Sequence, residues 1–421
     1  MKYFFILGSN PTLSLAELAA VFNYADEIYL VQPNIAVLET DQKITAKVIK
    51  KIGGTIKFGL VHEVMVIGES PLPAIIKFAK PRTGAGKFMF GISNYGKNNT
   101  NLKVLAMEFK KLLKQSSINS RWVTSREPTL SSVVVEQNKL TTDRGIEIVI
   151  IQFNQRWLLG KTLAVQPFKE LSYRDYGRPA RDDRSGMLPP KLAQIMINLA
   201  DPTRLIPART TPPKRLCQAD VRSGGKWVGG INSDATILDP FCGSGTIVTE
   251  AMLMGYRNII GSDISPRAIL DTKKNINWIK DNFKFKILNL KLLNADAAEI
   301  SKFLPANSVA AIITEPYLGP QRGLFNFSKT AKELERLYSK SLSEFKKILK
   351  SGARVVMVWP RFYNKRKNFF LQPDLNGLKI VNPLPENLRT NIFIKLTDRD
   401  TIVYGREQQK VWREIVVLEK N

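Results

Sequence analysis

Four acidic residues of this 421-residue chain follow short apolar runs: Asp239, Asp263, Asp296 and Glu315. Each run has the length and near-continuous hydrophobicity of a strand buried in a parallel sheet. The carboxyl ends of such strands lie along one edge of the sheet, where α/β proteins bind their ligands. The four carboxylates therefore predict one site that accepts hydrogen bonds from hydroxyl or amino groups.

The stretch after the first run, "DPFCGSGT" from Asp239 to Thr246, predicts a tight loop. Gly243 and Gly245 let the backbone turn sharply and approach a ligand closely, and the following helix directs free N–H groups at the site. The stretch is not a phosphate-binding loop, because no Gly-Lys-Ser/Thr follows, and it lacks the third glycine of the dinucleotide fingerprint. A tight turn without a ligand is the alternative interpretation.

Asp263 and Asp296 have types and positions suited to binding a nucleoside. Asp263 ends the second run, in "IIGSDIS", where an acidic side chain accepts two hydrogen bonds from ribose hydroxyls. Asp296, in "LLNADA", could bind the edge of an adenine together with the backbone N–H of Ala297. Because aspartate is also a common helix N-cap, a structural role is the alternative at both positions.

The elements that position these residues alternate between strand and helix, which predicts an α/β domain with a mostly parallel, doubly wound sheet. A further helix is expected in "MLPPKLAQIMINLA", which has proline at its start. The other expected elements are strands at 235–239, 258–264, 286–296, 309–316 and 353–359, helices at 245–255, 266–280 and 330–350, and a final antiparallel strand at 410–420.

The N-terminal half has a different, α+β pattern. Residues 1 to 55 predict strand, helix and strand, and the following segment predicts strands at 86–96, 132–140 and 147–163 around an amphipathic helix at 101–115. A stretch rich in Pro, Gly and alternating charge follows, which is typical of a linker. The predicted boundaries are an N-terminal α+β domain at 1–55, a second domain at 56–165, a linker at 166–185 and the α/β domain at 186–421.

The charge of the chain predicts a polyanionic partner. Sixty-three Lys and Arg oppose 37 Asp and Glu, for a net charge of +26, and so much like charge repels itself unless a partner neutralises it. We favour contact with a nucleic-acid backbone over a merely solvated basic face. The basic residues that cluster on and after the helix at 101–115 are Lys103, Lys110, Lys111, Lys114, Arg121 and Arg126.

Cysteine and histidine usage excludes several other classes of protein. Two cysteines, Cys217 and Cys242, do not make a disulfide scaffold and suit the reducing cytoplasm. The single histidine, His62, leaves no zinc site with histidine ligands and little room for Ser–His catalysis, so no metal is expected. No apolar stretch reaches the roughly 18 residues that span a membrane, and "MKYFFILGSN" predicts a first strand rather than a targeting segment.

The motifs "DPFCGSGT", "SDIS", "NADA" and "ITEP", in this order, resemble those of the Rossmann-fold S-adenosylmethionine-dependent methyltransferases. The upstream "RDYGRPARDDRSGMLPPKLAQIMINLA" is similar to the THUMP-containing tRNA guanine-N2 methyltransferases of the guanosine-10 type. The resemblance implies S-adenosyl-L-methionine as cofactor, tRNA as substrate and a THUMP RNA-binding domain at 56–165. It implies Asp239, Cys242, Gly243 and Gly245 around the methionine portion, Asp263 at the ribose and Asp296 at the adenine, and Pro240, Ile264 and Ala297 complete the predicted cofactor site.

The predicted catalytic motif, Glu315-Pro316-Tyr317, departs from that family. Where the family has Thr-Asp-Pro-Pro-Tyr-Gly, this chain has "TEPYLG". The exocyclic amine of guanine is a poor nucleophile, so the site must hold its hydrogens on acceptors and stabilise the charge that develops on nitrogen. Glu315 keeps the carboxylate and Tyr317 keeps an aromatic face, on which a stacked base gains about 1–3 kcal/mol. We interpret the motif as a working variant.

Two other functions use the same residues. A DNA amino-methyltransferase would need the four strand ends but not the THUMP-like half. A non-catalytic tRNA-binding protein would result if Glu315 cannot replace aspartate. For tRNA methylation, the target base must be flipped out of its stem. The modified position, the number of methyl groups, the oligomeric state and a requirement for a small activating protein partner stay open.

Overall fold

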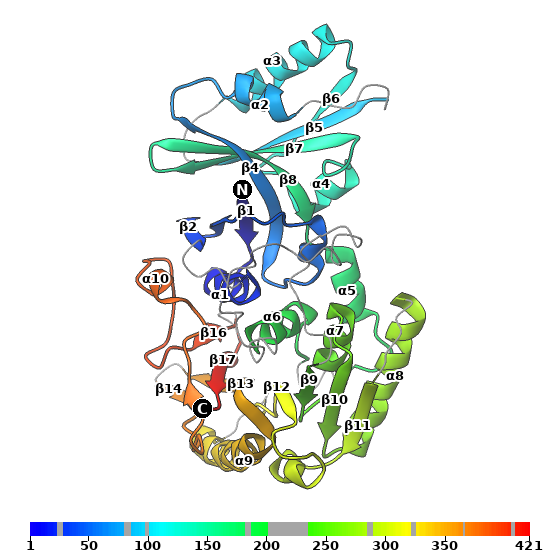
Figure 1. The fold of residues 1–421 in the computed structure, drawn as a ribbon, viewed down its shortest axis with the longest axis vertical. Helices are drawn as coiled ribbons and strands as arrows, with labels where there is room; N and C mark the ends of the chain where they lie inside the picture. Colours follow the sequence, from blue (N-terminus) through cyan, green and yellow to red (C-terminus); the bar gives the residue numbers. More distant parts are fainter. Residues whose placement is uncertain are drawn as a thin grey trace, which may run out of the picture. The chain divides into compact units, whose positions relative to one another are not determined.

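A computed structural model describes residues 1–22, 28–79, 86–96, 101–181, 187–200, 235–283, 289–320, 326–364, 367–405 and 409–421. The chain divides into two compact units, and each is described by itself (Figure 1). Unit 1 comprises Met1–Pro11, Asp26–Lys50 and Thr55–Pro167. Unit 2 comprises Thr12–Ala25, Lys51–Gly54 and Phe168–Asn421.

Unit 1 is built on one mixed sheet of eight strands in the order β2-β3-β1-β4-β8-β7-β5-β6. Strands β5 and β7 pair in parallel, whereas β7 and β8 form an antiparallel hairpin. The strands are β1 (Lys2–Leu7), β2 (Ile28–Gln32), β3 (Ile35–Glu39), β4 (Thr55–Val66), β5 (Phe88–Tyr95), β6 (Ser120–Val123), β7 (Gly145–Phe153) and β8 (Arg156–Val165). The helices are η1 (Ala46–Lys50), α2 (Leu72–Phe78), α3 (Leu102–Gln115) and α4 (Ser132–Gln137).

The amphipathic helix expected at 101–115 is confirmed as α3. Its apolar positions recur every three or four residues, and Phe109 packs edge-on against Phe90 of β5 with 5.0 Å between ring centroids. All six predicted basic residues on and after this helix are exposed. The apolar stripe therefore faces the core of unit 1 and leaves its lysines to solvent.

Two expectations for this half differ from the structure. The predicted boundary near residue 55 falls within a continuous sheet, because β4 pairs with β1 on one side and with β8 on the other. The strand expected at 132–140 is the helix α4. Ser131 caps that helix by accepting a hydrogen bond from Val134 N, and this N-cap outweighs the strand preference of the valine run.

Unit 2 contains a nine-stranded sheet whose main path runs β11-β10-β9-β12-β13-β17-β15. Its first five strands are parallel, and β17 is antiparallel to β13 as expected (Figure 1). The parallel strands are β9 (Thr236–Asp239), β10 (Asn258–Asp263), β11 (Asn289–Asn294), β12 (Val309–Thr314) and β13 (Leu349–Asn364). The others are β14 (Lys367–Phe370), β15 (Lys379–Ile380), β16 (Ile402–Tyr404) and β17 (Val411–Glu419). The predicted Rossmann-like α/β fold is confirmed for this unit.

The helices of unit 2 are α1 (Pro11–Phe22), α5 (Phe168–Tyr176), α6 (Pro190–Ala200), α7 (Thr246–Met254), α8 (Pro266–Phe283), η3 (Ala297–Lys302), α9 (Phe327–Ile348) and α10 (Glu386–Arg389). The helices expected in the α/β domain are confirmed as α6, α7, α8 and α9, whereas α5, η3 and α10 were not expected. Strand β12 lies between β9 and β13 and is buried along its whole length.

The predicted linker at 166–185 differs from the structure over its first half. Residues Phe168–Tyr176 form helix α5, which belongs to unit 2. Arg174 of this helix is buried and makes a two-point ion pair with Glu250 of α7, at 2.7 and 3.0 Å. A charged side chain can be buried when a partner compensates for its desolvation. A partner that is distant in sequence cannot be identified from the local composition. Cys217 lies outside the described residues.

Candidate active site

A cleft of about 780 Å³ opens at the carboxyl ends of the parallel strands of unit 2. Strands β9 and β10 end at Asp239 and Asp263, Asp296 lies two residues after β11, and Glu315 follows β12 directly. Every predicted site residue except Gly245 lines this cleft. The convergence of the four acidic strand ends, expected because parallel strands end at one edge of the sheet, is therefore present in the structure.

Asp239 is a buried carboxyl that ties β9 to β12. Its Oδ1 accepts a 2.7 Å hydrogen bond from Thr314 Oγ1 and a 3.3 Å bond from Phe241 N. Burial raises the pKa of Asp239 to about 7, and the nearby charges of Asp263 and Glu315 act in the same direction. The side chain thus supports the floor of the cleft.

The two glycines of the loop have different roles. Gly243 has φ 52°, a Cβ placed on it would meet nothing within 4 Å, and its N–H donates to Asp263 Oδ2 at 2.9 Å. Gly245 has φ 84° and precedes helix α7, and a Cβ there would lie 2.8 Å from Thr272 Cγ2. Gly243 therefore leaves room for a ligand, whereas Gly245 allows the loop to pack against α8. The ligand contact expected at Gly245 is not supported by this geometry.

Asp263 and Asp296 both bind backbone N–H groups as well as facing the cleft. Asp263 accepts from Gly243 N through Oδ2 and from Ser265 N through Oδ1, each at 2.9 Å. Asp296 caps η3, because its Oδ1 accepts from Ala298 N at 2.9 Å. Each carboxylate oxygen has a second lone pair, so these structural bonds leave acceptors for a ligand.

Cys242 is buried, and burial with the charge of Asp239 raises the pKa of its thiol well above the ordinary range. Its Sγ lies 3.7 Å from Thr272 Oγ1. The side chain stays a neutral thiol at physiological pH and packs against α8, so it cannot serve as a thiolate nucleophile.

Glu315 forms an ion pair that its sequence context does not reveal. Nε of Arg413, on β17, lies 2.5 Å from Oε1 of Glu315, and Nη2 lies 3.5 Å from Oε2. The two side chains are only 12% and 13% exposed. The carboxylate at the end of β12 is therefore held by a guanidinium from a distant strand.

Tyr317 leaves its ring accessible while its backbone is fixed. The residue is 57% exposed and lines the cleft, and its carbonyl oxygen accepts a 2.8 Å hydrogen bond from the buried Tyr338 hydroxyl. The flanking Pro316 and Leu318 are buried. The aromatic group that faces the cleft is thus Tyr317, and Leu318 anchors the turn.

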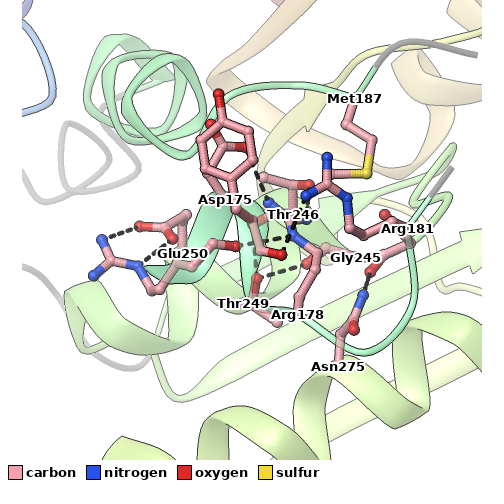
Figure 2. Close-up of polar contacts among 12 residues, drawn as sticks. Asp175, Arg178, Arg181, Met187, Gly245, Thr246, Thr249, Glu250 and Asn275 are labelled. Atoms are coloured by element: carbon pink, nitrogen blue, oxygen red, sulfur yellow. Dashed lines mark hydrogen bonds and ion pairs between the residues drawn. The ribbon is translucent and has the colours of Figure 1, made fainter. Parts of the chain in front are cut away.

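The segment just before α6 frames the glycine loop, a role missed by its interpretation as a linker (Figure 2). The buried Arg178 donates to Thr246 Oγ1 at 2.6 Å. Asn275 of α8 exchanges hydrogen bonds with the backbone of Ala180 and also donates to Ser244 O, all at 2.8–3.0 Å. These bonds join residues 178–180 to the start of α7. Arg181 and Met187 of the same segment line the cleft.

The single histidine lies outside the cleft. His62 stacks on Phe78 in unit 1 at 4.5 Å, and its pKa is lowered to about 4 by burial and by Lys161, so it is neutral at physiological pH. Within the described part of the chain, no three His, Cys, Asp or Glu residues gather to hold a metal ion. None of the described helices is both long and apolar enough to span a membrane.

Comparison with known proteins shows that this region is similar to methyltransferase domains. Residues 227–369 match a family model described as UPF0020: RMKL-like, methyltransferase domain. The chain is 26% identical over 240 residues to a tRNA (guanine(10)-N2)-dimethyltransferase of Methanothermobacter thermautotrophicus, covering 56% of this chain and 58% of that protein. It is 28% identical over 227 residues to a protein of the same name from Methanocaldococcus jannaschii, covering 52% and 51%.

The chain thus spans little more than half the length of these curated relatives. Among solved structures, the crystal structure of TrmN from Thermus thermophilus matches with a TM-score of 0.48 and 18% identity, with 100% of both chains covered. A TM-score below 0.5 does not by itself establish a shared fold, and the sheet order of unit 2 rests on its own strand pairing.

Proposed function

We propose that this chain is an S-adenosylmethionine-dependent methyltransferase that acts on the exocyclic N2 amine of guanine in tRNA, in the cytoplasm. The observation that carries the proposal is the cleft where four acidic strand ends converge beside an open glycine loop. Its volume, about 780 Å³, falls in the range of small-molecule sites. The names of the two relatives support the choice of guanine in tRNA.

The residues present fit the cofactor. Gly243 leaves its side of the cleft open for the methionine portion, and Asp263 has lone pairs left for ribose hydroxyls. Asp296 and the N–H of Ala297 are the candidates for the adenine edge. When bound, S-adenosylmethionine supplies an electrophilic methyl group carried on a positively charged sulfur.

The chain's own residues would present the amine to that methyl group. Glu315 and a main-chain carbonyl of the motif accept the amine hydrogens, which aims the nitrogen lone pair. As nitrogen bonds to carbon it gains positive charge and must release a proton, and a nearby carboxylate stabilises this charge. The exposed ring of Tyr317 supplies a stacking face for a base flipped out of its stem.

Unit 1 is proposed to hold the tRNA backbone. Its exposed cluster on α3, β6 and the following loop supplies the positive charge, and the chain carries a net charge of +26. Electrostatic contact with phosphates is independent of sequence and positions the substrate. We also propose that this unit contains a THUMP-like module. A small protein partner that activates the enzyme belongs to the same proposal.

Nucleoside mass spectrometry tests the reaction. tRNA incubated with the protein and S-adenosylmethionine should gain methylated guanosine at N2, and a duplex DNA of equal concentration should gain nothing. Glu315→Gln should lower single-turnover methylation at least tenfold with little change in binding, because the charge matters most as nitrogen becomes cationic. Glu333→Gln, an exposed residue of α9, is the matched control and should behave like the wild type.

Calorimetry with S-adenosylhomocysteine tests the cofactor site separately. Asp263→Ala should weaken binding by about 1.5–3 kcal/mol, the range for hydrogen bonds that involve a charged group. Unchanged affinity would remove Asp263 from the site. If the protein binds the cofactor but methylates no RNA, the proposed activity is wrong and the protein is a non-catalytic RNA-binding protein.

A further inference from the structure

The Glu315–Arg413 pair joins two segments that are far apart in sequence and separated by one strand in the sheet. Glu315 follows β12, Arg413 lies in β17, and β13 runs between them. Because neighbouring strands lie about 4.8 Å apart, the two backbones are roughly 10 Å apart. Long side chains are needed to bridge that distance, and the 2.5 Å contact between Arg413 Nε and Glu315 Oε1 shows that they do.

The length of the glutamate matters for this contact. Shortening the side chain to aspartate removes one methylene, about 1.5 Å of reach. The contact would stretch from 2.5 Å to a distance that no longer makes a hydrogen bond. Glutamate at position 315 and arginine at position 413 therefore match each other in length.

Arg413 acts through Glu315 and not on a ligand directly. Glu315 lines the cleft, whereas Arg413 is not among its lining residues. Burial by itself would lower the pKa of Arg413, but the charge and hydrogen bonds of Glu315 outweigh it, so the pKa is raised and the guanidinium stays charged. Its Nη2 also lies 3.5 Å from Met187 O, in the segment that borders the cleft.

The two carboxylate oxygens are held unequally. Oε1 receives the short bond of 2.5 Å from Nε, whereas the bond from Nη2 to Oε2 is long, at 3.5 Å, and therefore weak. The guanidinium thereby fixes one oxygen and leaves the lone pairs of the other available. An acceptor held in this way loses little conformational freedom when a substrate amine binds.

We propose that Arg413 is a positioning residue for the altered strand-end motif. It anchors Oε1 of Glu315 so that Oε2 is presented to the substrate amine, and it makes glutamate rather than aspartate the functional residue at position 315. This inference rests on the proposed methyl transfer and adds to it the residue that sets the geometry of the acceptor.

The adjacent residue of β17 provides a matched control. Glu414 points to the opposite face of the strand and pairs with Arg399 through two bonds of 2.6 and 2.7 Å. Arg399 also lies over the Trp359 ring at 4.9 Å. Neither Arg399 nor Glu414 lines the cleft, so this pair has the same chemistry and a similar burial without access to a ligand.

A double-mutant cycle tests the proposal. Single-turnover methylation of tRNA at saturating cofactor is measured for the wild type, Glu315→Asp, Arg413→Gln and the double variant. In the wild-type background, Glu315→Asp should slow methylation at least tenfold while the Kd for S-adenosylhomocysteine changes less than twofold. In the Arg413→Gln background, the same change should cost less than threefold, because the anchoring bond is already absent.

The controls separate positioning from a loss of stability. Arg399→Gln should lower Tm but keep the tenfold Glu-to-Asp ratio. Arg413→Lys retains the charge without the planar guanidinium that places Nε on Oε1. It should give an intermediate ratio, and it replaces Arg413→Gln in the cycle if that variant does not fold. The same Glu-to-Asp ratio in both backgrounds would overturn the inference and leave the proposed function intact. A wild-type protein that binds cofactor and tRNA but transfers no methyl group would overturn both.

Discussion

Thr314 Oγ1 donates a 2.7 Å hydrogen bond to the buried Oδ1 of Asp239, and so joins the ends of two neighbouring parallel strands, β9 and β12. Asp239 and Glu315 thus occupy adjacent strand ends in a poorly solvated region. Burial raises the pKa of Asp239 to about 7. The residue that begins the glycine loop is therefore expected to titrate near physiological pH.

This titration predicts a pH-dependent stability. Between about pH 4 and pH 7 the native Asp239 keeps its proton while the unfolded chain loses it, so stability should fall as pH rises. Asp239→Asn retains the acceptor for Thr314 and removes the titration. The decrease in the free energy of unfolding from pH 5 to pH 8, measured by chemical denaturation, should be smaller in this variant than in the wild type by on the order of 2–4 kcal/mol. Equal drops in both proteins would contradict the assignment.

The contribution of Glu17 to the pH dependence of stability must be measured separately from that of Asp239. Burial raises its pKa to about 7 as well, although the N–H groups of Gly53 and Gly54 and the amide of Asn198 partly offset burial. It lies in unit 2 like Asp239, so its contribution has the same sign and the same pH window. The Glu17→Gln single variant and the Asp239→Asn/Glu17→Gln double variant show whether the two contributions add.

The two glycines of the loop should respond differently to alanine. Gly245→Ala combines a left-handed backbone, costing roughly 1–2 kcal/mol, with a clash against Thr272. Gly243→Ala has only the backbone cost but places a methyl group in the open side of the cleft. We expect Gly245→Ala to lower Tm more than Gly243→Ala does. We expect Gly243→Ala to weaken S-adenosylhomocysteine binding more than Gly245→Ala does, when each loss of affinity is compared with the decrease in Tm of the same variant. The reverse order in calorimetry and thermal denaturation would refute these roles.

Arg178 is expected to support the cofactor site from behind. Arg178→Lys loses the bond to Thr246 or the one to Arg174 O, because a lysine cannot make both with the same geometry. Cofactor affinity should fall about three- to tenfold, equivalent to roughly 1 kcal/mol, since Thr246 lines the cleft. The exposed Arg336 of α9 offers the control, and Arg336→Lys should leave affinity unchanged.

The basic surface of unit 1 should determine the salt dependence of tRNA binding. Replacing Lys110, Lys111 and Lys114 of α3 by glutamine should weaken affinity at low salt. It should also flatten the slope of log K against log salt by about 0.7–0.9 for each phosphate that the variant no longer neutralises. Lys43→Gln/Lys47→Gln, elsewhere in unit 1, is the control of like type. An unchanged slope in the triple variant would exclude α3 from the tRNA interface.

These substitutions are preferable to a truncation near residue 186. Such a truncation would also remove Arg174 and Arg178, whose buried bonds to Glu250 and Thr246 belong to unit 2. It would further remove α1, which carries the buried Glu17. A loss of tRNA binding in the shortened protein would therefore not distinguish a missing interface from a damaged fold.

The local sequence pattern was sufficient to predict the α/β fold of unit 2 and most of the residues that line its cleft. Continuous apolar runs predict buried parallel strands, and the residues at their carboxyl ends converge because parallel strands share an edge. Asp239, Asp263, Asp296 and Glu315 were found in this way. Gly245 was assigned to the ligand because a glycine needed for packing and one needed for ligand access look alike in sequence.

Tertiary structure alone decided which charges are buried and what holds them. Arg174 with Glu250 and Glu315 with Arg413 pair across long stretches of chain, so the composition of either neighbourhood could not reveal them. Part of the stretch that is typical of a linker is a helix with the buried Arg174, and a valine run is a capped helix. Burial of a charge depends on a partner that only the folded chain brings within hydrogen-bond distance.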